Sequence, residues 1–312
     1  QQAGHLLGSS LVHLHIGQGL HNIVYTGDLK FGRTRLFDAA FTNFQRVETL
    51  ITESTSGGAE DVLPPRQESE QQLLDIVNKT MERNGQVLIP SFAVGRAQEV
   101  MLILDNYMRT GLLREVPIFI EGMINEVTAI HTAYPEYLSR ELRDQILHQD
   151  INPFQSEYFT IVKSPDERDE IVNGGPCVIL ATSGMLEGGP VLDYFKRLAE
   201  DPRNTLIFVS YQIEGTLGRR IQHGLTEVSM INSEGKMEIL KRAMRVESVE
   251  GLSGHSDRNQ IINYVRRVAP KPERAIIYHG ERAKCIGLAN ALYKITRIDS
   301  IAPENLETIK LR

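Results

Sequence analysis

The middle of the sequence alternates between short apolar runs and amphipathic stretches, and this alternation constrains the fold more than any other feature. Four buried strands are predicted from apolar runs at 87–89, 117–120, 177–181 and 206–209. Helices are predicted from the spacing of apolar residues over 66–84, 95–110, 123–133 and 189–200. Strands that alternate with helices form a parallel sheet with crossover helices, so we predict an α/β architecture for this region.

Both ends of the chain follow another pattern. Near the start we predict a hairpin turning at Gly17-Gln-Gly19 and a short strand at 47–52. After about residue 225 we predict a second hairpin with its turn at 232–235, a strand within 243–250, a strand at 275–278, and helices over 257–268 and 282–295. The simplest organisation is one domain made from both ends, residues 1–58 and 253–312, with an α/β domain of residues 59–252 inserted between them.

Five polar residues are candidates for a metal centre. Asp28, Glu53, His255 and His279 each lie at or just past the end of an apolar run, where layered sheet proteins place their sites. His5 precedes a strand and has glycines nearby that allow close backbone approach. Imidazole and carboxylate together suit zinc, and one aspartate can bridge two ions. The alternative for any single histidine is a structural residue of the surface or core.

The other histidines lack such neighbours. His13 and His15 alternate on a strand and face the same side, but no carboxylate or third histidine follows them, so we predict strand surface. Four more histidines are interpreted as structural: His21, His131, His148 and His223.

Three glycine-containing turns join predicted strands to predicted helices, at 90–96, 182–190 and 210–220. Free amides, a helix N-terminus and arginine side chains could hold a phosphate in each. The alternative is a tight strand-to-helix turn without a ligand. The candidate phosphate-binding residues are Arg96, Ser183, Gly184, Gly215 and Arg219.

Charge and cysteine content limit the possible partners and compartment. The net charge of −6 argues against a simple nucleic-acid-coating protein, yet residues 241–312 carry 14 Lys and Arg against 8 Asp and Glu. This segment could receive a polyanion, or the asymmetry is ordinary fluctuation. No apolar stretch approaches the length that spans a bilayer, so we expect no membrane association. Cys177 and Cys285 are expected to be free thiols, which favours the cytoplasm.

Taken together, these residues resemble the metallo-β-lactamase fold nucleases of the β-CASP group, and within it the archaeal homologues of the cleavage and polyadenylation specificity factor endonuclease. His5 in Ala-Gly-His and Asp28 in Thr-Gly-Asp look like the third and fourth metal motifs. Glu53, His255 and His279 match the family's motifs A, B and C. The resemblance covers essentially the whole chain. It implies a partial αββα metallo-β-lactamase fold with an inserted β-CASP parallel-sheet domain.

The resemblance also implies an activity and roles for the residues. Complete relatives hold two zinc ions, of which the first would be bound here by His5 and Asp28 and the second by Asp28 and His279. His255, oriented by Glu53, would protonate the leaving 3′ oxygen, and the inserted domain would grip neighbouring phosphates. The implied reaction is endonucleolytic cleavage of single-stranded RNA in 3′-end processing or transcription termination, with possible 5′–3′ exonuclease activity.

One family motif is absent. His-x-His-x-Asp-His, which lies upstream of the third motif, does not occur, and His13 and His15 cannot replace it. Because the sequence opens on Gln1 directly before the third motif, we expect a C-terminal part of a longer protein, without the KH-type RNA-binding domains and the first part of the metallo-β-lactamase domain. Alone it should be inactive, or hold at most one loosely bound metal through His5, Asp28 and His279.

Two other functions are considered, together with one partner. A non-catalytic RNA-binding pseudonuclease would also lack metal ligands, although four expected site residues remain. A small-molecule metallohydrolase is disfavoured by the large insertion between Glu53 and His255. The tail, residues 299–312, is interpreted as a final strand, and its resemblance to a dimerisation element of archaeal relatives leads us to expect a homodimer.

Overall fold

The computed structural model describes residues 1–231 and 235–311. The chain forms two compact units, which are described separately. Unit 1 comprises residues 1–63, 136–140 and 254–312, and unit 2 comprises residues 64–135 and 141–253. The predicted boundaries at 58/59 and 252/253 therefore differ from the observed ones by five residues and by one residue.

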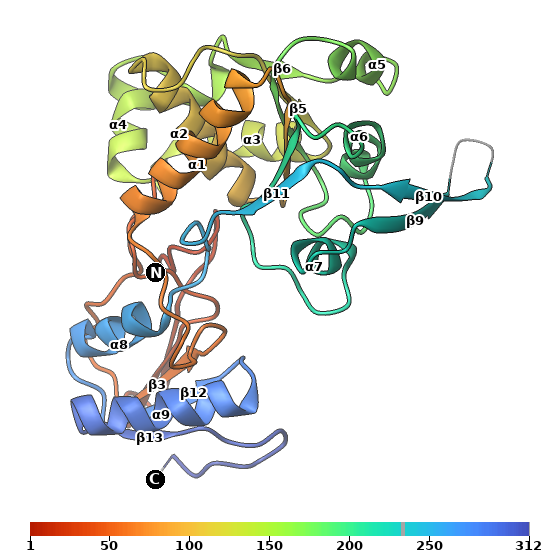
Figure 1. Ribbon diagram of the computed structural model, residues 1–312. Helices are drawn as coiled ribbons and strands as arrows, with labels where there is room; N and C mark the ends of the chain where they lie inside the picture. Colours follow the sequence, from red (N-terminus) through yellow and green to blue (C-terminus); the bar gives the residue numbers. More distant parts are fainter. Residues whose placement is uncertain (232–234, 312) are drawn as a thin grey trace. The chain divides into compact units, whose positions relative to one another are not determined.

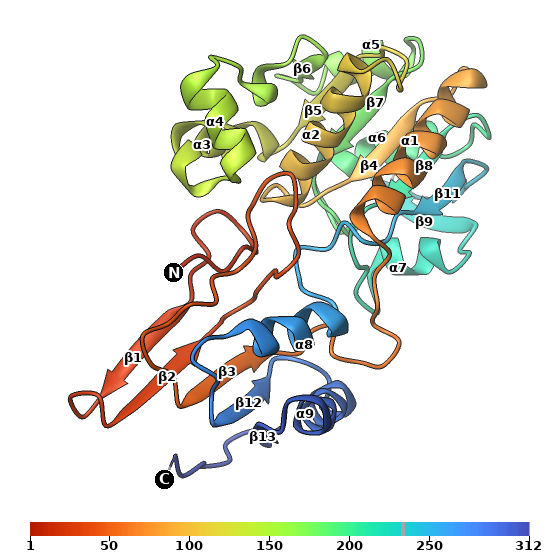
Figure 2. The ribbon, with the colours of Figure 1, turned by 90° about the vertical axis from the view of Figure 1, so that its left-hand side faces the viewer.

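Unit 1 is built on a five-stranded sheet with the strand order β1-β2-β3-β12-β13. Only β1 and β2 pair in antiparallel fashion, and the other neighbours are parallel. The strands are β1 (Val12–Ile16), β2 (His21–Tyr25), β3 (Thr49–Glu53), β12 (Arg274–Tyr278) and β13 (Asp299–Ile301). Two helices accompany them, α8 (Arg258–Arg267) and α9 (Arg282–Thr296), and Figure 2 shows the β1–β2 hairpin at the opposite edge of the sheet from β13.

The two faces of this sheet differ. On one face, Val24, Leu50 and Ile277 are buried in a core together with the apolar sides of α8 and α9. Side chains alternate along a strand, so the neighbours of these residues point to the other face. There β1 carries a row of exposed apolar side chains, Val12, Leu14 and Ile16, with 45%, 48% and 44% of their surface accessible.

Unit 2 contains a parallel six-stranded sheet with the order β11-β8-β4-β7-β5-β6 (Figure 1). Its strands are β4 (Val87–Pro90), β5 (Ile118–Glu121), β6 (Phe159–Ile161), β7 (Val178–Ala181), β8 (Thr205–Phe208) and β11 (Arg245–Ser248). The helices are α1 (Arg66–Glu82), α2 (Arg96–Arg109), α3 (Ile124–Ala133), α4 (Arg140–His148), α5 (Glu167–Val172), α6 (Pro190–Leu198) and α7 (Leu217–Gln222). Short 3₁₀ turns lie at Pro135–Tyr137 and Pro153–Gln155.

Both faces of the central strands of unit 2 are buried. Leu88, Ile179 and Leu206 contribute to one core with α5, α6 and α7. The alternate residues of the same strands, such as Val87 and Val178, are equally inaccessible on the opposite face. Parallel strands covered on both faces read as continuous apolar runs, which is why the sequence pattern identified them.

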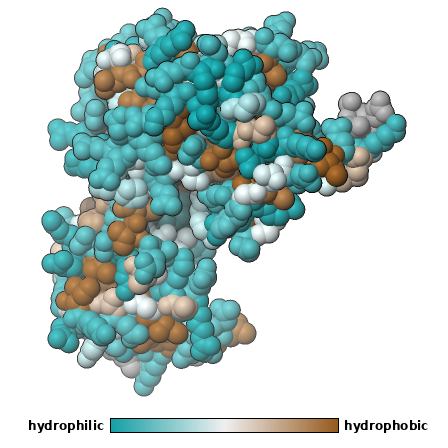
Figure 3. All heavy atoms as spheres, in the orientation of Figure 1, coloured by the Kyte–Doolittle hydropathy of each residue, from teal (hydrophilic) through white to brown (hydrophobic). Residues whose placement is uncertain are grey.

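A separate two-stranded hairpin, β9 (Glu227–Ile231) and β10 (Met237–Lys241), belongs to unit 2. One of its faces exposes Ile231, Met237 and Ile239, and brown spheres mark apolar residues on this part of the molecule in Figure 3. The turn predicted at 232–235 lies mostly outside the described residues, since 232–234 are not among them.

Two features differ from the sequence expectation: the segments that form unit 1, and three elements of unit 2. Residues 136–140 belong to unit 1, because Ser139 donates hydrogen bonds to the carbonyl oxygens of Leu36 and Arg35, each over 2.8 Å. Unit 1 is thus assembled from three segments and not from the two ends alone. The elements α4, α5 and β6 were not predicted. Each has few buried residues, so its apolar periodicity is weak.

Two further findings concern the cysteines and the helices. Cys177 and Cys285 are both free and buried. Within the part of the chain that the structure describes, no helix combines the length and apolar character needed to cross a membrane.

Candidate active site

The polar residues predicted for the metal centre come together at one edge of the sheet of unit 1. The carboxyl ends of β2, β3 and β12 meet there, since Tyr25 pairs with Ile51 and Tyr278 pairs with Glu53. Glu53 ends β3, while Asp28 and His279 follow the ends of β2 and β12. The carboxyl edge of parallel strands is the usual place for a site in such sheets.

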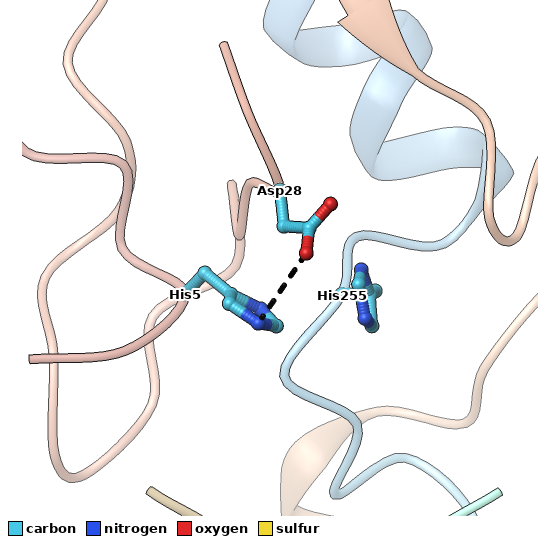
Figure 4. Close-up of side chains that lie close together, drawn as sticks. All are labelled: His5, Asp28 and His255. Atoms are coloured by element: carbon cyan, nitrogen blue, oxygen red, sulfur yellow. Dashed lines mark ion pairs between the residues drawn. The ribbon is translucent and has the colours of Figure 1, made fainter. Parts of the chain in front are cut away.

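Asp28 lies between two histidines. Its Oδ1 is 3.5 Å from Nε2 of His279, and its Oδ2 is 4.0 Å from Nε2 of His5. One ligand atom from each of His5, Asp28 and His255 also lies within 4.8 Å of the others (Figure 4). His255 therefore lies in the same cluster as the predicted ligands His5, Asp28 and His279. Its ring centre is 4.5 Å from that of His5.

A hydrogen bond orients His5. Its Nδ1 is 2.8 Å from the carbonyl oxygen of Gly254, which can only accept, so Nδ1 carries the proton. Nε2 then has a lone pair on the side of Asp28. Burial lowers the pKa of His5, outweighing the Gly254 hydrogen bond, and so favours the neutral ring that a metal requires. A backbone carbonyl that holds the far nitrogen is the usual support for a ligating histidine.

The distances around Asp28 suit a zinc ion. Two atoms that each bind one tetrahedral zinc at about 2.0–2.1 Å lie about 3.3–3.4 Å apart. The 3.5 Å gap to His279 is close to this separation, and the 4.0 Å gap to His5 requires only a small approach. Both gaps are too long for direct hydrogen bonds. The donor set of two imidazoles and a carboxylate fits zinc, although it gives each of two ions only two ligands.

Glu53 and His255 form a hydrogen-bonded pair. Nδ1 of His255 is 3.0 Å from both carboxylate oxygens of Glu53, whose side chain is inaccessible to solvent. Burial raises the pKa of Glu53, but the hydrogen bond and charge of His255 outweigh it and lower the pKa overall. For His255, burial alone would lower the pKa. The hydrogen bond and the charge of Glu53 outweigh burial, so the pKa of His255 is raised overall. The pair therefore favours a protonated imidazole beside Asp28.

The loop after β2 and the loop before α8 are fixed to each other. Nζ of Lys30 donates to the carbonyl oxygen of His255 over 2.9 Å. The amide of Ser256 donates to the oxygen of Leu29 over 2.9 Å, and the amide of Phe31 donates to Oγ of Ser256 over 2.8 Å. These bonds hold the segments that carry Asp28 and His255 in register.

Sequence reasoning missed these supporting groups. Most of them are backbone atoms, such as the oxygen of Gly254 and the amide of Leu29, which donates to Glu53 over 2.7 Å. Every residue has such atoms, so no sequence signal distinguishes them. Ser256 was the one detectable member, because it directly follows His255.

In unit 2 the glycine turns contact one another. A Cβ at Gly184 would lie 3.0 Å from the amide nitrogen of Phe92, so the turn at 182–190 approaches the turn at 90–96 closely. The oxygen of Gly184 accepts a 3.0 Å hydrogen bond from Nε2 of Gln212 in the third turn. The amide of Ser183 donates to the oxygen of Gly188 over 3.1 Å.

The first amides of α7 also have partners. Leu217 donates to the carboxylate of Glu187, Gly218 donates to the oxygen of Met185 over 3.1 Å, and Arg219 donates to Oγ1 of Thr216 over 3.2 Å. The expectation of free amides in these turns is therefore wrong for Ser183 and for the start of α7. These amides already donate to protein groups, one of which is a carboxylate.

The side chains of the turns remain candidates for phosphate binding. Burial lowers the pKa of Arg96 to about 10, which still leaves its guanidinium charged at neutral pH. Nη1 of Arg219 lies 3.3 Å from Oε1 of Gln222, and its Nε lies 3.7 Å from a carboxylate oxygen of Glu214. Gly215 has a φ of +89° and open space around its Cβ position. A phosphate-binding role for these residues stays a prediction.

The sheets and the Asp28 cluster define a class. A strand-end cluster of histidines and carboxylates on a layered α/β unit, interrupted by a parallel-sheet insertion, is the arrangement of the metallo-β-lactamase superfamily. Two domain families match the sequence: the Beta-Casp domain over residues 97–221, and the Zn-dependent metallo-hydrolase RNA specificity domain over residues 239–303. The chain belongs to the β-CASP family of this superfamily, as the sequence resemblance predicted.

Three curated relatives from archaea carry the name transcription termination factor FttA. The protein of Pyrococcus abyssi is 54% identical over 311 residues, covering 99% of this chain and 48% of its own length. That of Methanothermobacter thermautotrophicus is 53% identical over 310 residues, covering 99% and 49%. That of Methanocaldococcus jannaschii is 50% identical over 311 residues, again covering 99% and 49%. The chain thus spans about half the length of these relatives.

Proposed function

We propose that this chain is part of a zinc-dependent ribonuclease that cleaves phosphodiester bonds of single-stranded RNA during 3′-end formation or transcription termination. The observation that carries the proposal is the Glu53–His255 pair beside Asp28. The name of the second domain family, which refers to zinc and to RNA specificity, supports it. So does the name of the relatives, which refers to transcription termination.

Each site residue has a distinct task in this proposal. His5, Asp28 and His279 would hold zinc, which when bound supplies Lewis-acid activation of water and of the scissile phosphate. His255 donates a proton to the departing 3′ oxygen, for which its raised pKa is suited. Glu53 keeps the imidazole protonated and oriented, because it accepts from Nδ1 and leaves Nε2 as the donating nitrogen.

We further propose that the 312 residues alone do not hold a complete pair of zinc ions. His5, Asp28 and His279 supply at most two ligands for each ion, whereas zinc sites use three or four. Zinc content can be measured by mass spectrometry after equilibration with zinc, on purified, tag-free chain with His13 and His15 both changed to asparagine so that only the Asp28 cluster is counted. We expect at most one ion at the Asp28 cluster, and two ions there would contradict the ligand count.

The activity is tested on protein extended to the length of the relatives. Single-stranded RNA, double-stranded RNA and a small ester substrate would be incubated with the extended protein and zinc. Cleavage of single-stranded RNA alone is expected. Preference for the ester would favour a small-molecule hydrolase, and RNA binding without cleavage would favour the pseudonuclease, the second candidate. The length of the fragments distinguishes endonuclease from 5′–3′ exonuclease activity.

We also propose a cytoplasmic homodimer joined through the C-terminal tail. The tail that follows β13 contacts unit 1: Nη1 of Arg274 in β12 donates to the oxygen of Lys310 over 3.0 Å, and Arg282 pairs with Glu304. Removing residues 303–312 should convert a dimer to a monomer in sedimentation velocity. An unchanged sedimentation coefficient, corrected for mass, would contradict the proposal.

A further inference from the structure

A second pair of histidines lies on β1, away from the residues that surround Asp28. His13 and His15 are two positions apart, so both side chains project from the same side of the strand. Their ring centres are 4.3 Å apart, and the rings are tilted by 49°. Phe44 packs its ring edgewise against His13 at 5.4 Å. The sequence predicted only strand surface here.

Hydrogen bonds assign a tautomer to each ring. Nε2 of His13 lies 2.8 Å from the carbonyl oxygen of Arg46, so Nε2 carries the proton and Nδ1 carries a lone pair. Nδ1 of His15 bonds to Oδ1 of Asn22. That oxygen can only accept, so Nδ1 carries the proton and Nε2 carries the lone pair. Each imidazole therefore offers one nitrogen to an electron-pair acceptor.

The partner of His15 is itself held in place. Nδ2 of Asn22 donates to Oε2 of Glu48 over 2.8 Å, which fixes the amide so that its oxygen faces the histidine. Glu48 is buried, and burial alone raises its pKa, but hydrogen bonds from Asn22 and Arg46 outweigh this and lower the pKa to about 2. A charged carboxylate thus anchors the amide that orients His15. Ligating histidines in metal sites commonly have such outer partners.

We propose that His13 and His15 form a second metal site, which takes a divalent transition-metal ion, Cu²⁺ most tightly. Two imidazoles bound at a right angle to one ion, with bonds of about 2.0 Å, have ring centres about 4.5 Å apart. The observed 4.3 Å is close to this separation, and a right angle between ligands is typical of the tetragonal geometry of Cu²⁺ and Ni²⁺. Because His15 is exposed, water completes the coordination.

The test is a Cu²⁺ titration of the intact, tag-free chain, followed by calorimetry and by electron paramagnetic resonance. Wild type should bind one Cu²⁺ more than the double variant His13→Asn/His15→Asn, and this ion should show coupling to two nitrogens. The matched control is His148→Asn, which changes an exposed histidine of α4 and should leave the count unchanged.

Single variants decide whether the two rings act together. Loss of an outer partner costs about 10–100-fold in metal affinity, so loss of either ligand should cost more than tenfold. The variant His15→Asn alters an exposed residue and keeps the test valid if changes at half-buried His13 disturb folding. An unchanged copper count and affinity in His15→Asn would overturn the proposal, as would an effect of one histidine only.

Discussion

The five-stranded sheet of unit 1 and the six-stranded sheet of unit 2 differ in how their strand ends use polar groups. At the edge of the sheet in unit 1, Asp28 lies 3.5 Å and 4.0 Å from its histidine neighbours, too far for hydrogen bonds and close to the spacing around an ion. In unit 2, the groups at the strand ends bond to one another at ordinary lengths, as Gln212 does to Gly184 over 3.0 Å.

This comparison separates two uses of one topology. Unit 1 leaves coordinating capacity at its strand ends and orients it with buried partners such as Glu53. Unit 2 uses part of the same kind of capacity to hold its turns together, and Arg96, Arg219 and Gly215 remain candidates for a ligand. Position at the end of a parallel strand therefore indicates where a site can form, while the distances between the polar groups indicate whether one does.

The largest expected effect would come from His255→Ala in protein extended to the length of the relatives. Removal of a general acid should lower the rate of RNA cleavage by about 10²–10⁴-fold. Zinc content should stay near that of wild type, and His148→Ala serves as the control for loss of a histidine. Turnover within a few-fold of wild type would assign the proton donation to another group and break the contrast between the units.

The contrast predicts that turns in unit 2 respond to volume more than to charge. A Cβ at Gly184 would lie 3.0 Å and 3.2 Å from backbone atoms of Phe92 and Ser91, so Gly184→Ala should destabilise by about 1–3 kcal/mol in denaturant unfolding. Gly188 is on the same turn and has open space at its Cβ position, so Gly188→Ala is the matched control. Equal stability of the two variants would mean that the turns are not tightly packed.

The Glu53–His255 pair predicts a pH dependence of stability for metal-free chain. The raised pKa of His255 stabilises the fold at low pH, and this contribution is lost as pH rises through the folded value. The lowered pKa of Glu53 stabilises at higher pH, and this contribution is lost as pH falls through its folded value. The free energy of unfolding should differ most between wild type and Glu53→Gln from about pH 4.3 to 6.5. A difference independent of pH would show that packing, not charge, explains the effect.

The smallest effect concerns the face of the sheet in unit 1 on which β1 exposes Val12, Leu14 and Ile16. The double variant Leu14→Thr/Ile16→Thr replaces two exposed apolar side chains on β1. Substitutions at such surface positions usually change stability by less than about 0.5 kcal/mol. Light scattering should nevertheless show less self-association of the chain at high concentration, because exposed apolar patches promote contacts. Unchanged scattering would mean that the row does not mediate association.

The sequence predicted most of the fold, for a physical reason. Strands buried on both faces, such as Val178–Ala181, are continuous apolar runs, and amphipathic helices such as Arg66–Glu82 repeat their apolar residues at a fixed spacing. Helix α4 escaped prediction because Leu142 is its only fully buried residue. Burial against the rest of the protein produces the pattern, so elements that bury little leave no signal.

The candidate site was predictable in its residues and less so in its contacts. Asp28 and His279 lie just past apolar runs, and the resemblance of their surrounding residues to family motifs distinguished them further. Which groups bond to which depends on segments that lie far apart in the chain, as with Gly254 and His5 or Gln212 and Gly184. The same limit hid the tautomers of His13 and His15, which only their partners reveal.

The ends of unit 1 that flank the insertion are joined to each other. The amide of Leu63 donates to Oδ2 of Asp257 over 3.2 Å, and the amide of Arg258 donates to the oxygen of Asp61 over 3.0 Å. The chain therefore leaves this unit and returns to it at neighbouring points, and residues 136–140 return to it once more in between. Because the two hydrogen bonds tie the segment directly after His255 to the segment after β3, a change of length in the intervening residues outside 136–140 should leave His255 in place.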